Sequence, residues 1–180
     1  MTDVSDVKRK YWAEALANEN FYCIETFSGF RGGMHADYKG ACHLLSPDAS
    51  DKRMGDALLD ALLHSRFVVS SPREGFIFPP EVEYDAELNI PEKVAERYKL
   101  WVEEMMQRYG YKTKRALFKG MRRCSVEVDE NTLTILPSHH EKLEAWSGDG
   151  ISKDDYVVLA AKSSAEEIGA ALRLAFSRCT

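Results

Sequence analysis

Two adjacent histidines, His139 and His140, are the residues of this chain whose type best suits acid–base or metal chemistry. Neighbouring side chains on a strand point to opposite faces, so the pair could share a metal only where the backbone turns. A metal site would also need further ligands such as Cys124 or Glu141, and neither H-x-x-x-H nor H-E-x-x-H spacing occurs. We therefore expect structural hydrogen bonds from both histidines, and we expect no metal or organic cofactor.

No other residue pattern points strongly to a nucleophile or a phosphate-binding loop. Cys124 or Ser138 could pair with a histidine, but no G-x-S-x-G turn surrounds either one. Glycines 29, 32 and 33 match neither G-x-x-x-x-G-K-[ST] nor G-x-G-x-x-G, so turn formation explains them. The four cysteines are dispersed and form no C-x-x-C pair, which favours free, buried thiols in a reducing compartment. We expect no catalytic residue.

Length and composition fit a single domain spanning residues 1–180. The chain is 44% hydrophobic and 29% charged, the ordinary balance of a globular protein with one core. Its longest apolar runs are too short to span a bilayer, and two aspartates precede the first basic residue. Neither a membrane span nor a secretory signal is expected, so we expect a cytoplasmic protein.

Charge is distributed in blocks of opposite sign along the chain, whose net charge is −5. Residues 81–104 contain eight acids and three bases, and residues 127–155 contain eight acids and two bases. Between them, residues 108–123 contain seven bases and no acid. Such blocks suggest surfaces that select a charged partner, or they only solvate the fold and neutralise one another. The basic block could bind phosphates, but the flanking acids would repel a polyanion, so direct nucleic-acid binding is not expected.

Two segments that resemble each other must supply much of the core. The segments LLSPDASDKRMGDALLDALL (44–63) and VLAAKSSAEEIGAALRLAFS (158–177) match at a constant offset of 114 residues. Each indicates a strand, a short loop, an N-cap serine and a helix with one apolar stripe. We expect the two strand–helix units to pack on the same sheet. Four residues of the stripes should be almost fully buried: Leu58, Ala61, Leu172 and Ala175.

Details of the two helices support this interpretation. Ser164 and Glu167 fit a capping box, in which each side chain accepts a hydrogen bond from the other residue's backbone N–H. Gly55 and Gly169 occupy equivalent positions inside the two helices, where glycine costs about 1 kcal/mol relative to alanine. Their presence in both segments suggests that a neighbouring helix or strand approaches closely there.

The remaining elements follow from apolar periodicity and from turn residues. Helices are expected over 4–18, from Pro91 to about Tyr109, and over 114–121. Strands are expected at 21–27, 41–45, 125–128, 132–136 and 156–160. The interleaving predicts an α/β or α+β fold. We expect one mixed sheet of about five or six strands, flanked by four or five helices.

Several long blocks of the sequence are distinctive. They are FYCIETFSGFRGG, SPDASDKRMGDALLDALLHSRF, RYGYKTKRALFKGMRRCSVEV, LPSHHEKLEAWSGDGI and EEIGAALRLAFSRC. Together they resemble the CdiI immunity proteins of bacterial contact-dependent growth inhibition (CDI), over roughly residues 20–70 and 94–179. The resemblance implies a protein that neutralises a cognate toxin domain (CdiA-CT), often a nuclease, by blocking its active site or substrate surface. It supplies no catalytic residues.

A toxin of this kind needs a positive cleft to hold phosphate, so an inhibitor gains specificity and association rate from acidic side chains. The segment 72–90 contains three prolines, which disfavour a long helix or a central strand. Within it lie the first candidate toxin-binding residues: Glu81, Glu83, Tyr84, Asp85 and Glu87. The tyrosine is of the type that anchors interfaces. The second candidate group is Asp149, Asp154 and Asp155. Alternatively, the first group only solvates a loop or pairs with the basic segment 112–123.

Two other functions compete with toxin neutralisation. The chain could be a small enzyme that uses His139 or His140, in which case alanine at these positions would abolish turnover. It could also be a nucleic-acid-binding regulator that uses the basic helix within 112–123, in which case it would bind nucleic acid alone in a salt-dependent manner. An immunity protein would instead form a tight, stoichiometric complex with the toxin encoded beside it.

Overall fold

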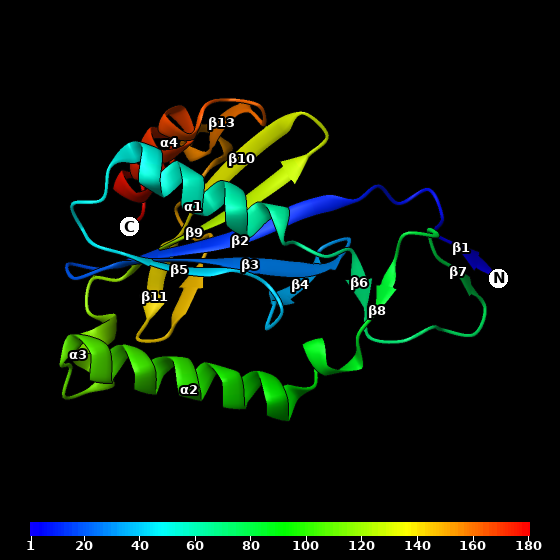
Figure 1. Cartoon of the computed structure of the whole chain (residues 1–180), viewed down its shortest axis with the longest axis horizontal. Coiled ribbons are helices and arrows are strands. Elements are labelled where there is room, and N and C mark those ends of the chain that lie inside the picture. Colours follow the sequence, from blue (N-terminus) through cyan, green and yellow to red (C-terminus); the bar gives the residue numbers. More distant parts are fainter.

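A seven-stranded antiparallel sheet with helices on both faces forms the body of the protein, in a computed structural model that describes residues 1–180 (Figure 1). The sheet runs in the order β13 (Val157–Ala160), β10 (Thr132–Pro137), β9 (Arg122–Asp129), β2 (Lys10–Ala17), β3 (Tyr22–Phe30) and β4 (Gly33–Ala36), and β5 (Cys42–Leu45) also pairs with β3. The helices are α1 (Asp51–Leu63) and α4 (Ala165–Ser177) on one face, and α2 (Pro91–Tyr109) and α3 (Lys114–Phe118) on the other.

Of the two expected fold classes, α/β and α+β, the structure shows an α+β fold in a single domain. The sheet has one strand more than expected, and every pairing within it is antiparallel. Two short pairs are parallel, β1 (Thr2–Asp3) with β7 (Phe76–Ile77) and β6 (Val68–Val69) with β8 (Glu83–Tyr84), and an isolated parallel bridge joins Gly29 to Phe67. A separate hairpin joins β11 (His139–Lys142) to β12 (Ala145–Ser147). The short 3₁₀ helices are η1 (Ala86–Leu88) and η2 (Lys153–Asp155).

The expectation of a helix over residues 4–18 is wrong. Residues 10–17 form β2, a central strand that is buried over most of its length because helices cover both faces of the sheet. A strand covered on both faces has no polar face, so its sequence lacks a period of two. Ala13, Ala15 and Ala17 face α1 and α4, while Leu16 faces α2. Alanine, leucine and glutamate favour helices locally, and tertiary burial overrides that preference here.

The expected strand–helix units do pack on one sheet, and the similarity between them extends further. β2, β3, β5 and α1 occur in the same order as β9, β10, β13 and α4, and β2 pairs antiparallel with β9 at the centre. The two halves are therefore related by an approximate two-fold axis between β2 and β9, with β5 and β13 on the outer sides. The expected burial is confirmed, since Leu58, Ala61, Leu172 and Ala175 are each fully buried.

The two glycines lie where α1 and α4 meet, as expected. A Cβ atom on Gly55 would lie 1.7 Å from the carbonyl oxygen of Ala165, and one on Gly169 would lie 1.8 Å from that of Asp51. Each helix thus packs its glycine against the backbone at the start of the other. The expected capping box of Ser164 and Glu167 is also present.

The remaining expectations hold with small shifts in boundaries. α2 ends at Tyr109, and the next residue, Gly110, adopts the left-handed conformation that suits a C-cap. The shorter helix α3 ends at Phe118 rather than near 121. The expected strands at 125–128 and 132–136 form the β9–β10 hairpin, and the last expected strand is β13. None of the helices combines the length and apolar character needed to cross a bilayer.

Only the second half of α2 packs closely on the sheet. Val102 and Met105 are buried there, together with Phe118 of α3 and Leu16 of the sheet. Earlier in the helix, Tyr98 is 42% exposed. This incomplete packing leaves space between α2 and the sheet.

Candidate functional site

The acidic segment, residues 81–87, crosses the end of the molecule that carries β6 and β8 (Figure 1). Its first part pairs with β6, and the carboxylate of Asp85 then accepts a hydrogen bond from the backbone N–H of Glu87, which caps η1. Val82 and Leu88 are buried and hold the segment to the body. These contacts fix the segment as an irregular but well-anchored strap.

Asp85 is buried inside this end of the molecule. Its carboxylate accepts hydrogen bonds from the Tyr38 hydroxyl at 2.8 Å and from the Arg66 guanidinium at 2.9 Å. Arg66 also binds both carboxylate oxygens of buried Asp37, at 2.7 and 2.8 Å. Burial alone would raise the pKa of Asp85, but these hydrogen bonds outweigh it and hold the pKa at about 2. Asp85 therefore anchors the strap, and its carboxylate has little capacity left for a partner.

The other candidate residues of the strap are exposed. Glu83 lies 3.4 Å from Arg66, and Glu87 forms an ion pair with Lys93 at 2.5 Å. Glu81 has no ion pair or hydrogen bond. Tyr84 is 51% exposed, and its ring meets the ring of Phe78 edge to face. No acid of the strap pairs with the basic segment 112–123.

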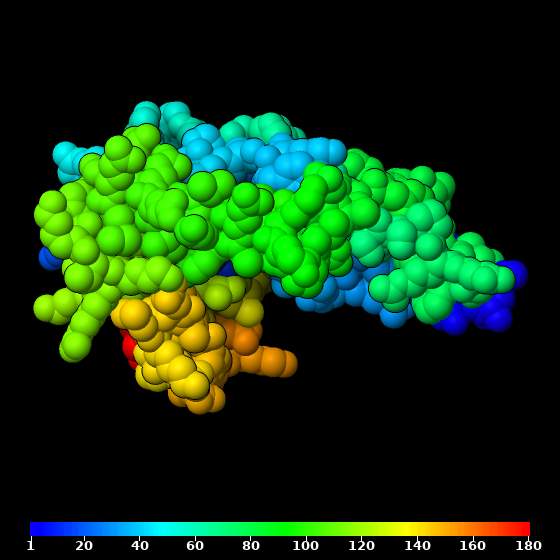
Figure 2. All heavy atoms as spheres, turned by 90° about the horizontal axis from the view of Figure 1, so that it is seen from below, coloured from blue at the N-terminus to red at the C-terminus, as the bar shows by residue number.

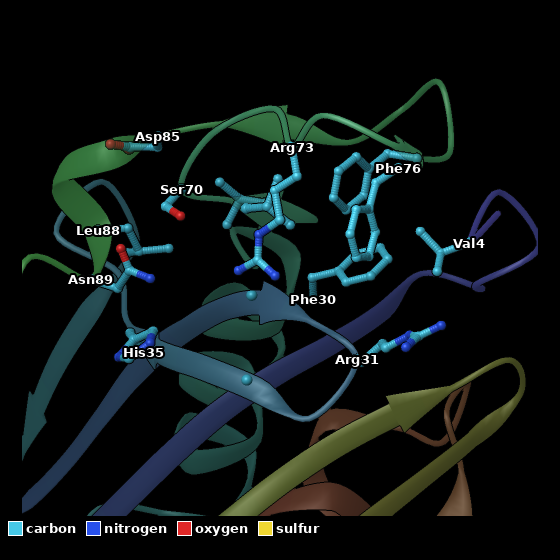
Figure 3. Close-up of a pocket in the computed structure, with 15 residues that line it drawn as sticks. Val4, Phe30, Arg31, His35, Ser70, Arg73, Phe76, Asp85, Leu88 and Asn89 are labelled. Atoms are coloured by element: carbon cyan, nitrogen blue, oxygen red, sulfur yellow. The ribbon is translucent and has the colours of Figure 1, made fainter. Parts of the chain in front are cut away.

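A pocket of about 280 Å³ opens beside the strap (Figure 3). Phe30, Phe76 and Phe78 line it, and the side chain of Arg73 points into it. The guanidinium of Arg73 makes no ion pair. The Tyr84 ring contacts Phe78, so it extends the aromatic lining of the pocket towards the strap.

The second candidate group lies elsewhere, between β12 and β13. Asp155 accepts hydrogen bonds from the backbone N–H and hydroxyl of Ser152, so its carboxylate caps η2. Asp149 and Asp154 are exposed and make no ion pair. No hydrogen bond or ion pair connects this group with the strap, so the structure does not bring the two candidate groups together.

A groove of about 540 Å³ runs between the first half of α2 and the sheet. Figure 2 looks at this face, with α2 in green and the β11–β12 hairpin in yellow beside it. Six of its 19 lining residues are Phe, Tyr or Trp: Phe27, Tyr38, Tyr98, Trp101, Phe118 and Trp146. The groove meets the strap at Tyr38, because the guanidinium of Arg97 lies over the Tyr38 ring and donates to the carbonyl oxygens of Glu87 and Leu88.

Two glutamates and one arginine lie on the floor of this groove. Glu14 of β2 and Glu25 of β3 are cross-strand neighbours, and Arg123 of β9 pairs with Glu14 at 2.6 Å. The side-chain carboxyl group of Glu25 makes no hydrogen bond or ion pair. Burial and the nearby charge of Glu14 raise the pKa of Glu25 to about 8. Glu25 is thus a carboxyl group with no partner in an aromatic-lined groove.

Glu14, Glu25 and Arg66 are not among the residues that the sequence pattern marks as functional. Glu14 lies in the segment 4–18, which was expected to be a helix and instead contains the central strand β2. Glu25 lies in a correctly predicted strand, where a lone acid among apolar residues was the available signal. Arg66 of the strap network follows α1 in an irregular stretch with no pattern to mark it.

The two histidines make separate structural contacts, as expected. His139 Nδ1 lies 2.9 Å from the Thr180 hydroxyl, and His140 Nε2 lies 3.1 Å from the carbonyl oxygen of Leu143. The His140 ring also stacks on Trp146 at 4.8 Å. Nowhere do three or more His, Cys, Asp or Glu side chains converge in a way that could hold a metal ion.

The basic segment 112–123 is only partly neutralised. Lys114 pairs with Glu144 at 3.1 Å and Arg123 with Glu14, whereas Lys112, Arg115 and Lys119 are exposed without ion pairs. The acidic neighbours along the chain therefore do not neutralise the whole segment.

Comparisons with known proteins agree with the resemblance found in the sequence blocks. The model of the CdiI family, described as CDI immunity protein, matches residues 11–179. Immunity protein CdiI-YPIII of Yersinia pseudotuberculosis serotype O:3 (strain YPIII) is 46% identical over 176 residues, covering 98% of this chain and 99% of that protein.

Solved structures give the same result. A chain of the CdiA-CT/CdiI toxin and immunity complex from Yersinia pseudotuberculosis matches with a TM-score of 0.93 and 46% identity, covering 97% of this chain and 100% of that one. A protein of unknown function from Neisseria meningitidis matches with a TM-score of 0.82 and 38% identity, covering 97% and 98%. The chain therefore belongs to the CdiI family of CDI immunity proteins.

Proposed function

We propose that this chain binds the CdiA-CT toxin domain encoded beside it and neutralises that toxin by covering its active site or substrate surface. The observation that carries the proposal is the match, at a TM-score of 0.93 and 46% identity, to a chain of a toxin and immunity complex. Residues 1–180 act as one immunity domain in the cytoplasm. Binding alone protects the cell, so no catalytic residue, metal or cofactor is needed.

The binding surface in this proposal is the exposed part of the acidic strap, with Glu81, Glu83, Tyr84 and Glu87. Its carboxylates complement a positive cleft, which supports a nuclease as the toxin. Tyr84 and the adjacent aromatic pocket supply the kind of anchor that dominates interface energies. Asp85 contributes by holding the strap in place, since ordering a loop on binding would reduce affinity. The group at Asp149, Asp154 and Asp155 is the alternative surface.

Mixing the chain with the toxin domain from the neighbouring gene tests the proposed function. We expect a tight one-to-one complex by calorimetry, loss of toxin activity, and survival of cells that express both proteins. The variant His139→Ala/His140→Ala should still protect cells wherever it folds. Failure to form a complex with a folded, active toxin would contradict the proposal, as would turnover that disappears in the double-histidine variant.

A nucleic-acid degradation assay tests the proposal that the toxin is a nuclease. The isolated toxin domain should degrade DNA or RNA, and a stoichiometric amount of this chain should stop the degradation. If the toxin is inhibited but attacks a different substrate, immunity stands and the nuclease proposal is wrong.

A further inference from the structure

Cys124 of β9 and Cys179, which follows α4, form a thiol pair outside the proposed toxin-binding surface. Their Sγ atoms lie 3.7 Å apart, although the residues are separated by 55 positions in the sequence. Cys124 is fully buried in β9, and Cys179, just beyond the end of α4, is partly exposed. The pair therefore combines one thiol that solvent can reach with one that is protected in the core.

We propose that Cys124 and Cys179 are an oxidation site, at which a peroxide converts the two thiols into an intramolecular disulfide. Bond formation needs the sulfur atoms to approach from 3.7 Å to about 2.05 Å. Cys179 is partly exposed and lies just beyond the last turn of α4, so its side chain can move towards Cys124 without disturbing the buried core. Its backbone N–H donates to Phe176, and that of Thr180 donates to Ser138.

The charge states of the two thiols assign them different roles. The neighbouring Cys124 thiol, acting against burial, lowers the pKa of Cys179 to about 7. Burial raises the pKa of Cys124 well above its ordinary value. A thiolate is the nucleophile in thiol oxidation, so Cys179 reacts first and Cys124 resolves the product.

The reaction balances with hydrogen peroxide as the oxidant. The Cys179 thiolate attacks one peroxide oxygen, the O–O bond breaks, and hydroxide leaves and becomes water with the proton that Cys179 lost. The resulting sulfenic acid is attacked by the Cys124 sulfur, the S–S bond forms, and the departing hydroxyl takes the Cys124 proton. Two thiols and one peroxide thus give one disulfide and two water molecules.

The other two cysteines provide an internal comparison. Cys23 and Cys42 also bring their sulfur atoms close, to 3.8 Å. They lie on paired antiparallel strands, but Cys23 is opposite Leu44 and Cys42 is opposite Glu25, so the two cysteines are diagonal neighbours. Diagonal Cα atoms are about 7–8 Å apart, which exceeds the usual span of a disulfide. We expect this pair to stay reduced, despite a similar sulfur–sulfur distance.

A disulfide here would tie the C-terminus to the centre of the sheet. The final residues already pair with the start of β11, since the backbone N–H of His140 donates to the Thr180 carbonyl oxygen. Closing a covalent loop of this length reduces the freedom of the unfolded chain. We expect oxidation to raise the midpoint of thermal unfolding by roughly 10 °C and expect a reductant to reverse the rise.

Peroxide treatment of the purified wild-type protein tests the proposal. After a brief exposure to hydrogen peroxide at pH 7.5, the protein is unfolded in guanidinium chloride, the remaining thiols are blocked with iodoacetamide, and the protein is digested without reduction. We expect one disulfide-linked peptide pair that contains Cys124 and Cys179, while Cys23 and Cys42 are alkylated. The variant Cys179→Ser should give no linked peptide, and the variant Cys42→Ser should behave as the wild type does.

Three results would overturn the proposal. The first is that all four thiols stay equally alkylated after exposure. The second is that Cys179 proceeds to sulfinic acid without cross-linking. The third is that the disulfide forms between chains or joins Cys23 to Cys42. Because the wild-type protein carries the decisive measurement, the result does not depend on whether a variant folds.

Discussion

Glu25 is the ionisable side chain whose protonation depends most directly on the groove beneath α2. A free glutamate ionises near pH 4.5, whereas burial raises the pKa of Glu25 to about 8 in the folded chain. Between these values the folded protein holds a proton that the unfolded chain has released. Folding stability must therefore fall as the pH rises from 4.5 towards 8, and the loss is complete above the folded pKa.

The first prediction concerns this pH dependence. For Glu25 alone, the free energy of unfolding should decrease by about 2 kcal/mol between pH 6.5 and 8.5. Glu25→Gln imitates the protonated form, so the variant should lose that part of the decrease and be more stable than wild type at pH 8.5. Urea unfolding at the two pH values measures both effects.

Glu144→Gln is the matched control for Glu25→Gln. Glu144 borders the same groove, but hydrogen bonds from Tyr98 and Lys114 lower its pKa. It is therefore ionised throughout the measured range, and its replacement should leave the slope with pH unchanged. An identical slope in wild type and Glu25→Gln would mean that Glu25 is already charged at neutral pH.

Arg66 is the residue on which the acidic strap depends. Its guanidinium binds Asp37 and Asp85, whose side chains are 0% and 6% exposed. We predict that Arg66→Met costs about 3–5 kcal/mol in the free energy of unfolding, because it leaves buried carboxylates without their main counter-charge. Limited proteolysis should also cleave the variant within residues 70–90 faster than wild type.

Lys93→Met provides the comparison for Arg66→Met. Lys93 pairs with Glu87 on the same strap, but both side chains are about half exposed. Exposed pairs contribute little, so this change should cost about 0.5 kcal/mol or less. Equal costs for the two variants would show that the strap is held by its apolar contacts alone.

At the scale of elements, the close contact between α1 and α4 requires glycine at one position in each helix. We predict that Gly55→Ala and Gly169→Ala each destabilise the protein by about 2–3 kcal/mol, although alanine favours helices by about 1 kcal/mol. The added methyl group would overlap a backbone carbonyl of the other helix, so the helices must separate. Thermal or urea unfolding measures the loss.

Gly148→Ala is the control for the helical glycines. A Cβ atom at Gly148 would meet nothing within 4 Å, and its backbone is not in the left-handed region. The substitution should therefore change stability by less than about 0.5 kcal/mol. If Gly55→Ala were equally neutral, α1 and α4 would have to pack further apart than the structure places them.

The elements also show what the sequence could predict. α1 and α4 each bury one stripe of a solvent-facing helix, so their period and caps were readable. β2 lies beneath helices on both faces, and continuous burial removed the alternation that marks a strand. For the same reason, the sequence did not show that the two-fold relation includes β2 and β9. These two strands share little sequence, even though they occupy equivalent positions in the two halves.

The candidate site was only partly predictable for a related reason. Acidic composition and prolines identified the strap, and its exposed members are where the charge pattern placed them. Composition could not show that Asp85 faces inwards, because its partners Tyr38 and Arg66 come from distant parts of the chain. The groove with Glu14 and Glu25 likewise exists only once three strands and α2 are assembled.

At the scale of the whole molecule, the net charge of −5 is unevenly presented. The strap exposes carboxylates at one end, while Lys112, Arg115 and Lys119 are exposed without ion pairs on the segment that carries α3. A positively charged partner should therefore be guided towards some faces and away from others. Long-range guidance acts on the association rate and weakens as salt screens it.

The final prediction uses this property to locate the toxin. The triple variant Glu81→Gln/Glu83→Gln/Glu87→Gln removes the exposed charges of the strap and leaves the anchoring Asp85 intact. We expect association with the cognate toxin to slow by about tenfold at low salt and its salt dependence to flatten, since steering contributes factors of about 10–10³. Tyr84→Ala should act mainly on dissociation and cost about 2 kcal/mol or more if its ring fills a pocket on the toxin.

The matched control, Asp149→Asn/Asp154→Asn, removes exposed acids from the second candidate group. Stopped-flow association at two ionic strengths separates the surfaces. If the triple variant keeps the wild-type rate and salt slope while the control loses them, the toxin binds at the second group, and the strap serves only to close that end of the fold.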